Sequence, residues 1–126
     1  MKRLDLIQKI IARKEQLGIT IENLAKLSGI GIRTLNRVLA NEDVKLSTIE
    51  KITSFLGLDF AGNEMVPIEE LIKRRAKEKA IFMASLVQDT SALEMQGLDS
   101  ESVNSLISMY EKAFLEGEYK KTLWVA

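Results

Sequence analysis

The sequence predicts an all-α fold, with four short helices in its first half and a helical hairpin in its second half. Three observations support this. Apolar residues recur at helical spacing of three and four, and no segment alternates as a strand would. Glycines fall where these patterns end, as is typical of helix C-termini. The 126 residues are 46% hydrophobic, which is enough for a packed core.

The first helix is expected over residues 4–17, ending at Gly18. Its apolar stripe would consist of Ile7, Ile10, Ile11 and Leu17, and its outer side of Lys9, Arg13 and Lys14. Thr20 can cap a second helix because its hydroxyl accepts a hydrogen bond from a first-turn amide. A third helix is expected to begin near Gly31 and to end at residues 40–41.

A fourth helix is expected after the polar loop 41–45 and is predicted to end at Gly57. The run Ser47–Glu50 reads as a capping box, in which Ser47 would cap the helix. Residues 1–60 would therefore form one domain, and residues 61–66, which lack a clear period, a linker. The apolar stripe of the fourth helix comprises Ile49, Ile52, Phe55 and Leu56.

Residues 67–126 would form a second, helical region. Pro67 suits the first turn of a helix that continues for more than 20 residues. Gly97 interrupts this pattern, and a last helix capped by Asp99 or Ser100 would follow, ending at Gly117. The stripe of the long helix comprises Ile68, Leu71, Ile72, Ala76, Ala80, Met83, Ala84, Val87 and either Ser91 or Leu93.

The segment 21–40 contains a helix, a tight turn and a second helix. Ala25 is small enough for the two helices to approach, and Gly29 can adopt the left-handed turn. The apolar seam between the helices would consist of Leu24, Ile30, Leu35 and Val38. Over residues 4–60 this pattern resembles the helix-turn-helix domain of the lambda-repressor-like (Cro/Xre) family, which implies binding to double-stranded DNA and transcriptional repression.

The resemblance assigns base contacts to the third helix, at Ile32, Arg33, Asn36 and Arg37. The arginines, four residues apart, share one face and fit the two acceptors of guanine. Asn36 would contact adenine or a phosphate, and Ile32 a thymine methyl group. Phosphate contacts are expected from Thr20, Lys26, Lys45 and the amide end of the fourth helix near Ser47.

Two positions depart from the family pattern. Ile21 stands where a glutamine often opens the second helix, and Gly31 replaces the serine or threonine that often begins the recognition helix. Gly31 can cap the helix but offers no hydroxyl to a phosphate. We therefore expect base reading to depend more on the arginines.

The charge distribution fits a DNA-binding first half. Residues 1–60 carry ten Lys and Arg against seven Asp and Glu, a net charge of +3, whereas residues 61–126 carry eight against eleven, a net charge of −3. The chain has no cysteine or histidine, which removes thiolate nucleophiles, zinc fingers and histidine bases. We therefore expect no enzyme activity, no metal and no cofactor. The absence of a signal peptide or a long apolar run predicts a cytoplasmic protein with no membrane contact.

Two features of the second half invite a functional interpretation. The basic cluster Lys73–Lys79 would either contact nucleic acid or form a solvated helix face. The tail carries Tyr119, Leu123 and Trp124, residue types that anchor interfaces. These three side chains would fold back over the C-terminal helices, close a homodimer, or bind a foreign partner.

The expected function is sequence-specific repression by a homodimer, because palindromic operators are read by dimers. Small proteins with such a head and a helical extension also resemble type II antitoxins, which repress their own operon and hold a cognate toxin protein. The alternatives are a plain phage- or plasmid-type repressor without a protein partner, and a protein-interaction module.

Overall fold

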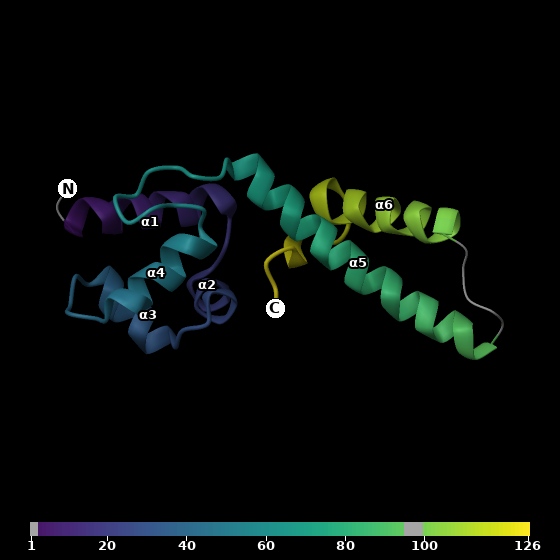
Figure 1. The fold of residues 1–126 in the computed structure, drawn as a ribbon, viewed down its shortest axis with the longest axis horizontal. Helices are drawn as coiled ribbons and strands as arrows, with labels where there is room; N and C mark the ends of the chain where they lie inside the picture. Colours follow the sequence, from purple (N-terminus) through teal and green to yellow (C-terminus); the bar gives the residue numbers. More distant parts are fainter. Residues whose placement is uncertain (1–2, 95–99) are drawn as a thin grey trace. The chain divides into compact units, whose positions relative to one another are not determined.

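The computed structural model describes residues 3–94 and 100–126 and confirms the all-α prediction within them (Figure 1). An isolated antiparallel bridge joins Leu58 and Glu64. The chain divides into two compact units, the first ending at Leu71 and the second comprising Ile72–Val125. The helices are α1 (Arg3–Leu17), α2 (Ile21–Ser28), α3 (Ile32–Leu39), α4 (Leu46–Phe55), α5 (Ile68–Glu94), α6 (Ser100–Glu116) and the short 3-10 helix η1 (Lys120–Thr122).

The core of the first unit is made of large aliphatic side chains from all four short helices. α2 packs against α3 and α4, and α1 packs against α3. The predicted seam between α2 and α3 is present, although Ile30 is only half-buried. The side chains with no measurable exposure are Ile10, Leu24, Leu35, Val38, Ile52 and Leu56.

The helix ends agree with the sequence at α2 but not at α4. The Thr20 hydroxyl accepts a hydrogen bond from the Asn23 amide at 3.1 Å, so the predicted cap is confirmed. The capping-box prediction for Ser47 is wrong. A cap at Ser47 would begin the helix at Thr48, but α4 begins two residues earlier, at Leu46, and its cap residue Lys45 makes no side-chain cap hydrogen bond. Ser47 therefore lies inside the first turn, where its hydroxyl cannot act as the N-cap.

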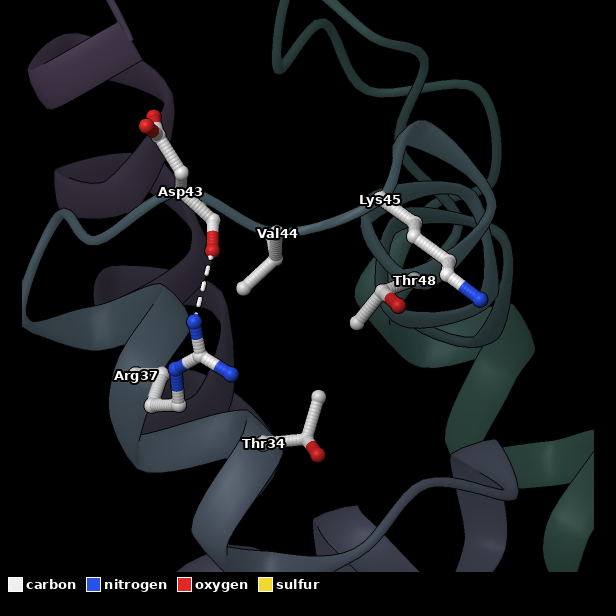
Figure 2. Close-up of a pocket in the computed structure, with 6 residues that line it drawn as sticks. All are labelled: Thr34, Arg37, Asp43, Val44, Lys45 and Thr48. Atoms are coloured by element: carbon white, nitrogen blue, oxygen red, sulfur yellow. Dashed lines mark hydrogen bonds between the residues drawn. The ribbon is translucent and has the colours of Figure 1, made fainter.

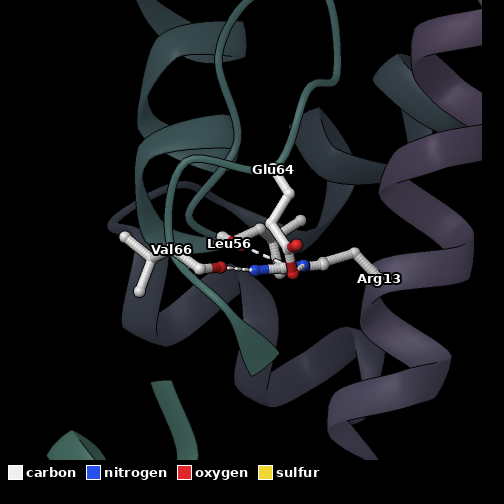
Figure 3. Close-up of polar contacts among 4 residues, drawn as sticks. All are labelled: Arg13, Leu56, Glu64 and Val66. Atoms are coloured by element: carbon white, nitrogen blue, oxygen red, sulfur yellow. Dashed lines mark hydrogen bonds and ion pairs between the residues drawn. The ribbon is translucent and has the colours of Figure 1, made fainter. Parts of the chain in front are cut away.

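Arg13, expected on the outer side of α1, is 5% exposed and binds the segment that follows α4 (Figure 3). Its Nε donates to the Leu56 carbonyl at 2.9 Å, its Nη1 to Glu64 Oε1 at 2.7 Å, and its Nη2 to the Val66 carbonyl. Ile11, expected in the apolar stripe, is instead 39% exposed. Residues 61–66, expected as a linker, thus include two partners of a buried arginine on α1, and the first unit continues to Leu71.

In the second unit, α5 contributes small side chains to the interior. Among the residues of this unit whose burial the structure describes, the buried ones are Ala76, Ala80, Ala84, Phe114, Leu123 and Trp124. Arg75 donates to the carbonyls of Leu123 and Val125, each at 2.8 Å, and Lys79 also donates to the Val125 carbonyl at 2.8 Å. The tail is therefore folded back within its own unit. Gly97 and Asp99 lie outside the described residues, and Ser100 is the first residue of α6.

Candidate nucleic-acid interface

The turn between α2 and α3 depends on Gly29, which adopts a left-handed conformation with φ of 78°. Its amide donates to the Lys26 carbonyl, and the Ile30 amide donates to the Ala25 carbonyl at 3.0 Å. This pattern closes the C-terminus of α2 and directs the chain into α3 within three residues. Ala25 is 3% exposed, as expected for a residue where the helices approach closely.

α3 presents one apolar face to the core and one polar face to solvent. Leu35 and Val38 are fully buried. The four predicted base-contacting residues lie on the exposed side of the helix: Ile32, Arg33, Asn36 and Arg37. A helix can enter the major groove only if such a face is free, so the arrangement suits base contact.

The two arginines of this face differ in their surroundings. Arg37 Nη2 donates a hydrogen bond to the Asp43 carbonyl at 3.0 Å, so its side chain is directed toward the loop before α4 (Figure 2). Arg33 makes no hydrogen bond or ion pair within the described part of the chain. Its guanidinium group therefore has its donors available for an external acceptor.

The predicted phosphate-binding residues are all exposed, namely Thr20, Lys26, Lys45 and Ser47, and so is Gly31. The Thr20 hydroxyl already accepts the capping hydrogen bond from Asn23. α3 begins after Gly31 and α4 after Lys45, and neither helix has a side-chain cap. Uncapped amides and the helix dipole favour an anion at both positions.

A hollow of about 550 Å³ lies between the exposed side of α3 and the first turn of α4 (Figure 2). Thr34 and Thr48, which sequence reasoning did not single out, bring hydroxyl groups to it. The sequence could have identified them by spacing, because Thr34 lies about one helical turn from Arg37 and Thr48 about one turn from Lys45. The hollow is lined by Thr34, Arg37, Asp43, Val44, Lys45 and Thr48.

Comparison with known families supports this geometry. Residues 10–63 match the family model described as helix-turn-helix. The first unit carries a lambda-repressor-like helix-turn-helix domain. The domain makes the chain a DNA-binding transcriptional regulator. No curated protein and no solved structure matches the chain.

Outside the helix-turn-helix domain, the structure places the other predicted site residues in the second unit. Leu123 and Trp124 are 6% and 8% exposed within a single chain. The Tyr119 ring lies 6.3 Å from the Tyr110 ring and 5.3 Å from the Phe114 ring, centroid to centroid. Of the three alternatives for the tail, the structure shows the one in which it folds back over the C-terminal helices. A partner-binding role for these residues stays a prediction.

The basic cluster Lys73–Lys79 divides into two groups. Arg75 and Lys79 bind the tail carbonyls, and Lys79 lies 5.5 Å from the centre of the Phe114 ring. Burial, and then the nearby Arg75 charge, lower the pKa of Lys79 below its ordinary value. Lys73, Arg74 and Lys77 are exposed.

Two further findings concern other site classes. The described residues contain no group of three or more His, Cys, Asp or Glu side chains that could hold a metal ion. Within residues 3–94 and 100–126, no helix is both long enough and apolar enough to cross a membrane.

Proposed function

We propose that this protein is a sequence-specific repressor that reads a palindromic operator as a homodimer. The observation that carries the proposal is the exposed face of α3, where Arg33 and Asn36 stand opposite the buried Leu35 and Val38. The buried side fixes the helix in the domain, and the exposed side supplies donors for base edges. Asn36 and Ile32 add amide and apolar contacts to the arginine contact.

The surrounding groups would hold the DNA backbone. Lys26 and Lys45 are exposed cations, and the first turn of α4 has no side-chain cap. These groups recognise phosphates, which carry no sequence information. They supply affinity and register, whereas α3 supplies the preference among sequences.

Base reading and phosphate holding can be separated by experiment. A preferred duplex would be selected from a random pool, and binding measured on that duplex and on a scrambled one at two salt concentrations. We expect Arg33→Ala to cost about 1–3 kcal/mol on the preferred duplex and much less on the scrambled one. Lys26→Ala should weaken both alike and flatten the salt dependence. An Arg33→Ala variant with unchanged binding would contradict the proposed reading helix.

The homodimer and a protein partner are assigned to the second unit. Exposed apolar side chains that lie close together on α5 support this assignment, since a contiguous apolar patch marks an interface more often than single exposed residues do. These side chains are Ile81, Phe82 and Leu86, with exposures of 46%, 60% and 48%. In the antitoxin form of the proposal, the same unit holds a cognate toxin.

The antitoxin role is tested by co-expression with the protein encoded by the neighbouring gene. We expect that protein to arrest growth alone and to be neutralised when this chain is present. A neighbouring protein that has no effect on growth would leave a plain repressor as the function.

A further inference from the structure

Two arginines from different helices hold the same short stretch of backbone in the loop between α3 and α4. Arg37 Nη2, from α3, donates to the Asp43 carbonyl at 3.0 Å. Arg3, from α1, donates to the Glu42 carbonyl, and its Nη1 lies 3.7 Å from Asp43 Oδ1. The Glu42 amide in turn donates to the carbonyl of Arg37 at 3.0 Å. Arg37 is thus joined to the loop by both its main chain and its side chain.

Apart from the two arginine side chains, the start of this loop is held by backbone hydrogen bonds from the Asn41 amide to the Val38 carbonyl and from the Glu42 amide to the Arg37 carbonyl, each at 3.0 Å. Asn41 adopts a left-handed conformation with φ of 60°, which reverses the chain after α3. Asn41, Glu42 and Asp43 are all exposed and contribute nothing to the apolar core. Hydrogen bonds from the two arginines therefore supply much of what determines the path of the backbone here.

The loop path decides where α4 presents its phosphate-binding groups. α4 begins at Leu46, three residues after the carbonyl that Arg37 holds, and Lys45 lies between them. A shift of the loop would move Lys45 and the first turn of α4 relative to the base-reading face of α3. Figure 2 shows Arg37 on one side of the hollow and Lys45 with Thr48 on the other.

We propose that Arg37 is a positioning residue, which fixes the loop 42–45 against the recognition helix and does not read a base. Base preference then rests on Arg33, one helical turn earlier, whose donors have no partner in the described part of the chain. This inference rests on the proposed DNA-reading function and changes the role that the resemblance assigns to Arg37. Loss of Arg37 weakens binding to every sequence by the same factor, whereas loss of Arg33 weakens binding to the preferred sequence.

The first test compares Arg37→Ala with Arg33→Ala as a matched control on the same face of the same helix. Binding of the full chain is measured on the selected duplex and on duplexes with each base pair changed. We expect Arg33→Ala to reduce the affinity ratio between preferred and changed duplexes by about 5- to 150-fold at one position. Arg37→Ala should lower all affinities while keeping these ratios within about twofold. A ratio that collapses at one base pair in Arg37→Ala would overturn the proposal.

The second test is made on the free protein, where a simple phosphate contact would have no effect. Amide hydrogen exchange is followed at Glu42, whose amide donates to the Arg37 carbonyl, and at Thr48, whose amide donates to the Lys45 carbonyl. We expect faster exchange in Arg37→Ala, partial rescue in Arg37→Lys, which can still donate one hydrogen bond, and no change in Arg33→Ala. Arg3→Ala should also speed exchange, and the effect of the double variant Arg3→Ala/Arg37→Ala should differ from the sum of the two single effects.

Unchanged exchange in Arg37→Ala overturns the positioning role even if DNA binding is intact. A wild-type chain that binds no duplex overturns the proposed function instead, and the exchange result then decides the positioning role by itself.

Discussion

The two units of this chain build their cores from different kinds of side chains. In the first unit, large aliphatic side chains from α1, α2, α3 and α4 meet in one core, and Ile10, Leu35 and Ile52 have no measurable exposure. In the second unit, the buried side chains among the described residues of α5 are alanines, and the larger buried side chains are Phe114, Leu123 and Trp124. Large apolar side chains of α5, such as Phe82, are left exposed.

This difference suggests that the two units serve different purposes, one for stability and DNA contact and the other for association. The first unit packs large aliphatic side chains into one core, and it also exposes several apolar side chains: Leu4, Ile11, Ile32, Leu46, Phe60 and Met65. In the second unit, the described residues of α5 bury alanines and expose the larger Ile81, Phe82 and Leu86. Exposed apolar side chains that form a patch mark interfaces more often than single exposed ones do. We expect stability to depend mainly on the large-residue core of the first unit, and association on the exposed apolar side chains of α5.

The largest effect is expected from removing one core side chain of the first unit. Leu35→Ala should lower the free energy of unfolding by about 3–5 kcal/mol, since Leu35 is fully buried where α3 meets the other helices. Leu46→Ala is a matched control because Leu46 is 69% exposed in the same unit, and it should change stability by less than about 0.5 kcal/mol. Urea unfolding followed by circular dichroism measures both. Equal losses in the two variants would show that the core is not where the structure places it.

In the second unit, the corresponding change is Trp124→Ala. We expect a loss of about 2–4 kcal/mol, below the full cost of removing a buried aromatic ring, because the tail can open locally without unfolding α5. Val125→Ala is the control, since Val125 is 44% exposed and its carbonyl still accepts from Arg75 and Lys79. Amide exchange in α5 and in α3 separates the two units. If Trp124→Ala speeds amide exchange in α3 as much as in α5, the two units are not stabilised separately.

Most of the first unit could be predicted from the sequence because its signals are local. The turn glycine Gly29, the small Ala25 and the cap Thr20 each act within a few residues of their own position. The apolar periodicities of α3 and α5 likewise follow from a single helix. At the start of α4, the local pattern placed the N-cap at Ser47, two residues after the observed cap residue Lys45.

The interactions that escaped prediction join residues distant in the sequence. Arg13 binds carbonyls 43 and 53 residues away, and Arg3 binds one 39 residues away. A periodic pattern identifies a charged residue near the edge of an apolar stripe but not the backbone oxygen that will face it. The burial of Trp124 could be expected from its chemistry, whereas the tail carbonyls that Arg75 holds could not, because they depend on the folded path of the main chain.

A smaller effect concerns the boundary of the first unit. A fragment ending at Leu71 should fold as a monomer and be more stable than a fragment ending at Gly62 by about 1–3 kcal/mol. The shorter fragment removes the Glu64 and Val66 acceptors of Arg13 and leaves donors of a buried guanidinium unsatisfied. Thermal unfolding of both fragments measures the difference in their stability. Arg13→Met should reduce this difference, because methionine has no donors that need the Glu64 and Val66 acceptors. Two fragments of equal stability would support the prediction that residues 61–66 act as a linker.

The smallest expected effect lies in the same boundary segment and depends on pH. The Asp59 carboxylate accepts the Asn63 amide at 2.8 Å and the Ala61 amide at 2.9 Å, and the Asn63 side-chain amide donates to it at 3.1 Å. The Asn63 backbone hydrogen bond is the largest of the effects that lower the pKa of Asp59 below 3.8, although partial desolvation acts in the opposite direction. Because folding favours the charged form, the stabilisation by the Asp59 carboxylate is present above pH 3.8 and is lost as the pH falls through the lowered pKa.

Asp59→Asn should therefore be less stable than the wild type at neutral pH, and the difference in stability between the two proteins should become smaller in strong acid. Parallel stability curves for the two proteins across this pH range would show that the turn is held by its backbone hydrogen bonds and not by the carboxylate charge.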